Sequence, residues 1–163
     1  MASFIATQAD KLGVILHVVN DYTNLVSSGT HIYKGHKPPI GTHVQYSFLM
    51  ECRKFAAFFG NKRGPKGRDI ASKDYLTAKL TFKLPVWKAW HDHMNVHLMH
   101  LSYDRLTSTT QWDGHTVNAD LLAEFQKAWK VFLSKVEEPY KSEFEKQIGL
   151  RERKHEYHGL DFR

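Results

Sequence analysis

The sequence contains one cysteine, Cys52, and five prolines in 163 residues. A single cysteine cannot form an internal disulfide or a paired-cysteine zinc or redox site, which excludes a disulfide-stapled secreted scaffold. No apolar run approaches the roughly 18 residues of a membrane-spanning helix. The first residues include the acidic Asp10 and lack the basic start of a signal peptide. We therefore expect a cytoplasmic protein with no membrane association.

Two catalytic motifs are also absent. The residue after His93 is Met94, so the zinc-protease pattern HExxH is not present. Gly60 and Gly64 lack the lysine and the hydroxyl residue that a phosphate-binding P-loop requires at its end. These absences argue against a zinc protease of that type and against a P-loop nucleotide hydrolase.

The composition is that of a basic globular domain. Lysine and arginine total 23 against 17 acidic residues, a formal charge of +6, and 11 histidines add to it when they are protonated. Hydrophobic residues make up 42% and aromatic residues 13%, which is enough to order a core. This predicts a single domain over 1–149, followed by a charged tail over 150–163.

Helical spacing of the apolar residues predicts amphipathic helices over about 4–26, 42–59, 85–106 and from 116 or 118 onward. A proline at 139 interrupts the last of these or starts a further helix. These patterns predict an all-α protein, an up-and-down helical bundle of four to five main helices.

Residues suited to helix ends give the expected boundaries. Ser3 is expected to cap the first helix, and Gly29 to end it. Pro85 fits the first turn of the third helix. Gly149 is expected to end the last helix. Between them, a short irregular segment at 69–84 is expected to form a short helix and then an extended run, since a lone strand would have no partner.

The predicted third helix carries the side chains best suited to catalysis or metal binding. His93, His97 and His100 form a stripe beside the apolar face, and Arg105 falls on the line of the apolar residues. That face consists of Trp87, Trp90, Met94, Leu98 and Leu101. A guanidinium pointing toward a core needs a carboxylate, a helix end or a bound anion as its partner.

Three interpretations of this stripe remain open. Imidazoles four residues apart on a helix can share a metal ion, with Asp104 or a residue such as His17, His43 or Glu51 completing the site. Alternatively, the histidines are boundary residues with ordinary hydrogen bonds. The third interpretation is acid–base chemistry on RNA, and for it we expect neither a metal nor another cofactor.

In the RNA interpretation, His97 and His100 transfer protons near neutral pH, and Arg105 holds a phosphate as charge develops on it. Tyr103 and Asp104 lie beside these residues and would contact the substrate. Histidine and arginine are thus the expected catalytic residues.

The block NVHLMHLSYDRL, followed by QWDG and an amphipathic helix, resembles uncharacterised bacterial proteins related to the HEPN superfamily, including abortive-infection-type members. The resemblance covers about 87–136. It implies a helical, often dimeric protein of a defence or toxin context, either an RNA-cleaving enzyme or an inactive binding module.

The order of residues differs from that of active HEPN ribonucleases, in which a histidine follows an arginine by four to six residues. Here His97 and His100 precede Arg105. Arginine precedes histidine at that spacing only in the tail, where Arg151 or Arg153 precedes His158. Whether the chain is an enzyme therefore stays open.

A basic stretch at 61–69 could bind the phosphates of RNA, although such a stretch is more often only a solvated loop. Its cations, and a further one on the flank of the second helix, are Lys62, Arg63, Lys66, Arg68 and Arg53. The sequence thus favours an RNA-binding or RNA-cleaving bundle. The alternatives are a non-catalytic bundle that dimerises or binds a protein, and a histidine-ligated metalloprotein.

Overall fold

The structure is a computed structural model that describes residues 6–32, 40–61, 69–94 and 114–154. Its elements in chain order are α1 (Gln8–Ile32), α2 (Ile40–Phe59), the 3-10 turn η1 (Ser72–Tyr75), α3 (Pro85–Met94), α5 (Gly114–Leu133) and α6 (Tyr140–Lys154). These described ranges contain helices and no strand, so the predicted all-α bundle is confirmed.

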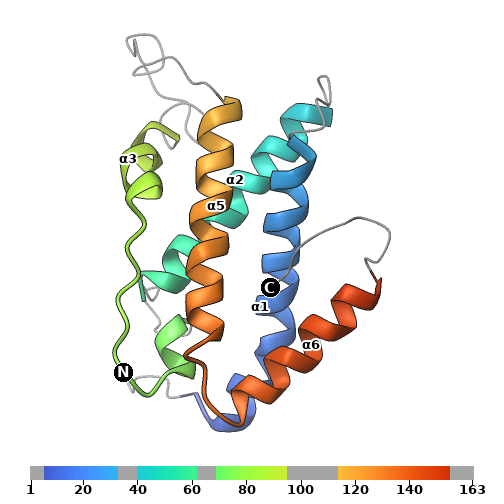
Figure 1. Cartoon of the computed structure of the whole chain (residues 1–163), viewed down its shortest axis with the longest axis vertical. Coiled ribbons are helices and arrows are strands. Elements are labelled where there is room, and N and C mark those ends of the chain that lie inside the picture. Colours follow the sequence, from blue (N-terminus) through green and yellow to red (C-terminus); the bar gives the residue numbers. More distant parts are fainter. Residues whose placement is uncertain (1–5, 33–39, 62–68, 95–113, 155–163) are drawn as a thin grey trace, which may run out of the picture.

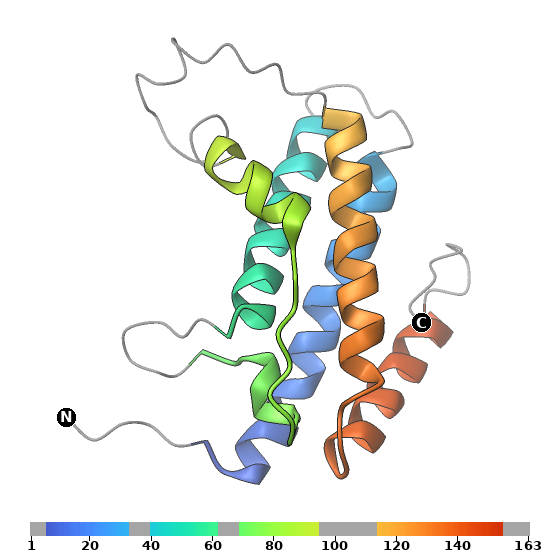
Figure 2. The same cartoon turned by 60° about the vertical axis from the view of Figure 1, so that its left-hand side comes forward.

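The long helices lie side by side, with α1 and α6 running in one direction along the bundle and α2 and α5 in the opposite direction (Figure 1). α1 packs against α2, α5 and α6, and α3 packs against α5. After η1 the chain bends at 77–78 and then runs extended along the bundle to α3, which both views show (Figures 1 and 2). None of the described helices is long and apolar enough to cross a membrane.

The core is an aromatic cluster around Trp129 of α5, whose side chain is fully buried. The Tyr22 ring of α1 stacks on it at 4.2 Å between ring centroids and 14° between planes. Phe55 of α2 meets Trp129 edge-on, and Phe144 of α6 does so from another side. One aromatic side chain from each long helix therefore meets in the centre of the bundle.

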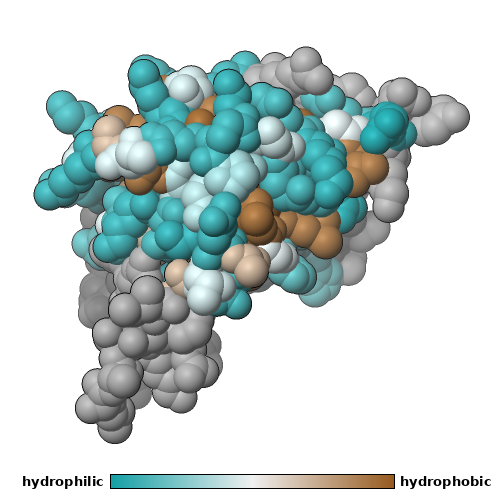
Figure 3. Space-filling view, turned by 90° about the horizontal axis from the view of Figure 1, so that it is seen from below, coloured by the Kyte–Doolittle hydropathy of each residue, from teal (hydrophilic) through white to brown (hydrophobic). Residues whose placement is uncertain are grey.

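The predicted apolar face of α2 is confirmed. Every residue assigned to it is buried, namely Phe48, Leu49, Cys52, Phe55, Ala56 and Phe59. The outside is correspondingly polar: seen from the end at which α1 begins, the described surface is mostly hydrophilic, with small groups of apolar residues (Figure 3). Burial of one face per helix is what holds the bundle together.

Both glycines expected to end helices are instead inside them. α1 continues past Gly29 to Ile32, and α6 continues past Gly149 to Lys154. A Cβ atom at Gly29 would lie 2.9 Å from Phe48 Cε2 and 3.1 Å from the Leu122 methyl carbons. Gly29 is therefore needed for the close approach of α1 to α2 and α5, and the prediction that it ends the helix was wrong. The prediction for Gly149 was wrong too.

The start of α1 also differs from the prediction. Ser3 lies outside the described residues, and α1 begins at Gln8. Thr7 caps it: the Asp10 backbone N–H donates to Thr7 Oγ1, and the Thr7 N–H donates to the Asp10 carboxylate at 2.9 Å. This reciprocal pair is a capping box with aspartate in the place of the usual glutamate. The negative charge of Asp10 also suits the first turn of a helix.

The expectations for 69–94 hold where they can be compared. η1 is the expected short helix, the extended run follows it, and Pro85 is the first residue of α3. The expected helix over 85–106 is described only to Met94, and residues 95–113 lie outside the described ranges. Likewise α5 ends at Leu133, whereas the apolar pattern suggested a helix reaching Val136, which is buried in the connection to α6.

Candidate functional site

The structure places only the beginning of the histidine-bearing segment. His93 belongs to α3, whereas the residues expected to act on RNA lie outside the described ranges. Those residues are His97, His100, Tyr103, Asp104 and Arg105. What the structure contributes is the way in which α3, the start of this segment, is fixed to the bundle.

Glu124 of α5 holds the first turn of α3. The Val86 N–H donates to Glu124 Oε1 at 2.8 Å, and the Trp87 N–H donates to Glu124 Oε2 at 2.9 Å. The first amides of a helix have no partner within it, and a carboxylate there also meets the positive end of the helix dipole. A residue of a different helix thus serves as the cap of α3.

Side-chain packing adds to this cap. The Trp87 ring lies 6.2 Å from that of Phe125 on α5, and the His91 ring lies 5.8 Å from Trp87. His91 Nε2 is 2.8 Å from the neighbouring Asp92 carboxylate. Trp87 and Trp90 are both half-buried against the core, as the apolar face of this helix predicts.

We expect Glu124→Ala to lower the free energy of unfolding by about 1–2 kcal/mol, the usual cost of losing a helix cap. The Val86 and Trp87 amides should exchange with solvent faster than in the wild type. Urea unfolding and amide hydrogen exchange measure the two effects, with the exposed Glu145→Ala as the matched control. Unchanged exchange at both amides would show that Glu124 does not hold α3.

Of the residues expected to bind phosphate, the structure describes only Arg53, which is exposed on α2. Lys62, Arg63, Lys66 and Arg68 lie outside the described ranges.

The chain on both sides of 62–68 is nevertheless fixed. Asn61 has a positive φ of 53°, and its Oδ1 accepts hydrogen bonds from Ser72 Oγ at 3.2 Å and from the Lys73 N–H at 3.0 Å. Asparagine tolerates this left-handed conformation better than most residues. The end of α2 is thus tied directly to η1.

The described flanks of the two predicted RNA-contacting segments lie apart along the length of the bundle (Figures 1 and 2). The end of α3 and the start of α5 lie near the end of the bundle at which α2 begins, whereas α2 finishes farther down the bundle. A 20-residue helix such as α2 is about 30 Å long. The structure therefore does not bring these flanks together into one site.

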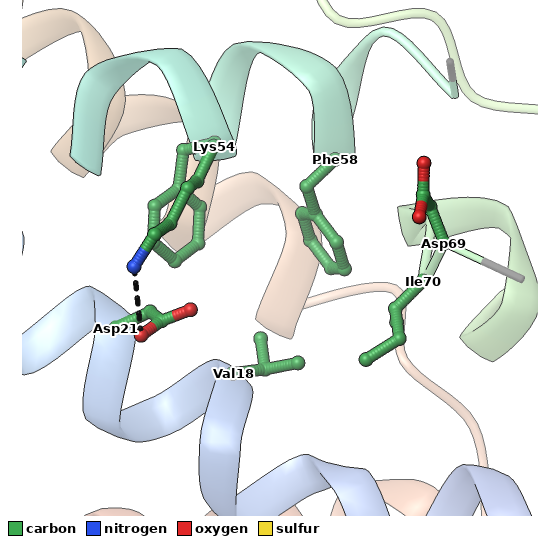
Figure 4. A pocket seen from close by; sticks show the side chains of 7 residues that line it. Val18, Asp21, Lys54, Phe58, Asp69 and Ile70 are labelled. Atoms are coloured by element: carbon green, nitrogen blue, oxygen red, sulfur yellow. Dashed lines mark hydrogen bonds and ion pairs between the residues drawn. The ribbon is translucent and has the colours of Figure 1, made fainter. Parts of the chain in front are cut away.

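A cavity that the sequence did not reveal lies between α1, α2 and the residues before η1 (Figure 4). It has a volume of about 400 Å³. Its walls are apolar and its rim carries charged groups: it is lined by Val18, Asp21, Lys54, Phe55, Phe58, Asp69 and Ile70. Apolar walls with a charged rim are the form of a small binding pocket.

Lys54 lies between two carboxylates at this rim. Its Nζ is 3.3 Å from Asp21 Oδ1 and 2.9 Å from Glu51 Oε1. Burial raises the pKa of the Glu51 carboxyl, and the hydrogen bond from Lys54 partly offsets the increase. Its second oxygen, Oε2, is buried and has no hydrogen-bond partner among the residues that the structure describes. Glu51 and Lys54 are three residues apart on one helix, a signal in the sequence, but their pairing with Asp21 depends on how α1 packs.

The remaining candidate residues of the described ranges do not gather into a reactive centre. Cys52 is fully buried, and burial raises the pKa of its thiol, so its assignment to the core is confirmed. His17 and His43 are exposed. The described part of the chain has no group of three or more histidine, cysteine or carboxylate side chains placed to hold a metal ion.

No protein-family model matches the chain, and no curated protein or solved structure is significantly similar to it. The fold and the placement of α3 are therefore the physical basis for a proposal about function.

Proposed function

We propose that this chain is a cytoplasmic, HEPN-like helical-bundle protein that binds RNA and cleaves it by metal-independent acid–base chemistry in a defence or toxin context. His97 and His100 transfer the protons, and Arg105 stabilises the phosphate. Tyr103 and Asp104 contact the same substrate, and Arg53 with the cations of 62–68 binds RNA farther along the bundle.

The observation that carries this proposal is the fixation of α3 by Glu124. Acid–base catalysis needs groups held in a defined geometry, and a helix docked on the bundle by its cap and by Trp87 supplies a rigid start for the segment that bears them. The surplus of basic residues supports binding to a polyanion.

Incubation of structured and single-stranded RNA with purified protein in excess EDTA tests the activity. We expect cleavage by the wild type and a loss of at least about a hundredfold in rate for His97→Ala, His100→Ala and Arg105→Ala, the lower end of the range for a general acid or base. His17→Ala is the matched control, because His17 is an exposed histidine elsewhere on the bundle.

Filter binding of the same RNA at rising salt separates binding from cleavage. Substitution of Lys62 and Arg63 by alanine should weaken binding and reduce its salt dependence. Cleavage that is absent, or equal in the wild type and His100→Ala, would refute the catalytic role. Salt-insensitive or absent RNA binding would refute the proposal as a whole.

A further inference from the structure

The extended segment 78–83 is held at both ends and unpaired between them. At its start, the Thr77 hydroxyl bonds to the Glu137 carboxylate, and the Glu137 N–H donates to the Tyr75 carbonyl. At its far end, Glu124 holds Val86 and Trp87. No backbone N–H or C=O of 78–83 has a hydrogen-bond partner in the part of the chain that the structure describes.

The side chains of this segment alternate as in a β-strand. Leu80, Phe82 and Leu84 are half-buried, whereas Thr81 and Lys83 are exposed. Phe82 packs on Phe59 of α2 at 4.6 Å between ring centroids. With alternate side chains fixed toward the bundle, the peptide groups point sideways along the two edges of the segment. Such a row of free donors and acceptors is what an added strand pairs with.

A groove runs along one of these edges. It has a volume of about 610 Å³ and lies between the extended segment and α5. On its α5 side the exposed residues recur at three- and four-residue intervals, Asp120, Ala123, Lys127 and Val131. As a strand, 78–83 spans about 17 Å from its first residue to its last, and Asp120 to Val131 also spans about 17 Å along α5, so the groove and the edge match in length.

Charged side chains of both signs line the groove, Lys83 and Lys127 with Asp120 and Glu124. Lys79, Lys83 and Lys127 are exposed beside it. Of the two acidic residues that line it, Glu124 is already bound to the amides of α3, which leaves Asp120. An occupant with regularly spaced carboxylates would therefore complement the groove.

We propose that this groove binds an acidic, extended peptide of a partner protein, which adds to 78–83 as a β-strand. Apolar side chains of the peptide pack on Ala123 and Val131, and its carboxylates face Lys83 and Lys127. This docking surface is separate from the RNA chemistry proposed above and stands without it.

Pairing with a second copy of the same segment fits less well. Two antiparallel copies centred on Thr81 would place Lys79 of each opposite Lys83 of the other, and like charges directly opposite destabilise a strand pair. RNA phosphates would pair with the lysines, but RNA would neither form strand hydrogen bonds with the free amides nor pack on the apolar side chains of the groove. A peptide satisfies all three features.

Fluorescence anisotropy with a labelled synthetic peptide of four valine–glutamate repeats tests the proposal. We expect saturable binding in the micromolar range, at least tenfold weaker binding when lysine replaces glutamate in the peptide, and at least tenfold weaker binding to Ala123→Trp. Ala123 is exposed on α5, so tryptophan there fills the groove without entering the core. Lys73→Glu is the control for surface charge away from the groove.

Two further peptides test strand addition itself. N-methylation of the valine amides and of the glutamate amides blocks opposite edges of the peptide, so one of the two should lose binding and the other retain it. Equal binding of both, no binding at about 1 mM peptide, or equal affinity for wild type and Ala123→Trp would overturn the proposal. Displacement of the peptide by single-stranded RNA together with insensitivity to Ala123→Trp would assign the surface to polyanions and overturn it as well.

Discussion

Trp129→Ala is expected to lower the free energy of unfolding by about 3–5 kcal/mol, the usual cost of emptying a large aromatic site in a core. The Trp129 side chain is fully buried and touches aromatic rings from all three of the other long helices. Its removal leaves a cavity that no single helix can close, because each neighbour is held by the others. Urea unfolding followed by circular dichroism measures the change.

A second substitution at this position separates packing from polarity. The Trp129 indole N–H is buried and has no hydrogen-bond partner in the described part of the chain, so Trp129→Phe removes an unsatisfied donor while it keeps a ring against Tyr22. We expect its cost to be less than half that of alanine. Val131→Ala, at a 40% exposed position of the same helix, should change stability by less than about 0.5 kcal/mol. A loss below about 1 kcal/mol for Trp129→Ala would contradict the central role of this residue.

Gly29→Val is expected to destabilise the protein by about 1–3 kcal/mol, the range for overpacking a well-packed interior. Even a Cβ atom would lie 2.9 Å from the ring of Phe48, and valine adds two methyl groups at this point. Relief requires α1 to move away from α2 and α5, which would loosen contacts along the whole of α1. Chemical denaturation of the variant measures the effect.

Gly13→Val provides the matched comparison, because Gly13 lies in the same helix and has no packing partner within 4 Å of the position that a Cβ atom would take. Valine has a somewhat better helix propensity than glycine, so Gly13→Val should leave stability unchanged or raise it by about 0.5 kcal/mol. Equal effects at the two positions would show that propensity, and not the close approach of helices, determines the role of Gly29.

Periodicity was sufficient to predict the fold class and the buried face of α2. The apolar residues of α2 recur at helical spacing, and all of them are buried. The extended run after η1 was predicted for a sound reason, since a lone strand has no partner, and the structure leaves its amides unpaired within the described residues. Patterns of this kind depend only on the distribution of apolar residues along one element.

The predictions of helix ends were wrong where the residue used as a signal has a second structural role. Glycine often ends a helix, but it also lets two helices approach closely, and only the position of Phe48 and Leu122 shows which applies at Gly29. At Gly149 there is open space where a side chain would lie, so no close packing explains this glycine. The helix nevertheless continues past it. Neither outcome is encoded within a few residues of the glycine.

The site was predictable only in part for the same reason. The histidine-rich sequence of 91–105 marks the candidate segment, and its beginning is indeed helical. The partner that fixes it, Glu124, is some 37 residues away in the chain, and no spacing rule connects them. The ion pair of Lys54 with Asp21 spans 33 residues and was missed likewise. Long-range polar contacts depend on the packing of whole helices.

The contact of Asn61 with η1 has a consequence for engineering the chain. Because Asn61 joins the end of α2 directly to Ser72 and Lys73, the bundle is closed at this point by hydrogen bonds that do not involve 62–68. Lengthening a connection between two fixed ends costs little entropy, about 0.6 kcal/mol per doubling. A reporter domain inserted between Asn61 and Asp69 should therefore leave the helices assembled.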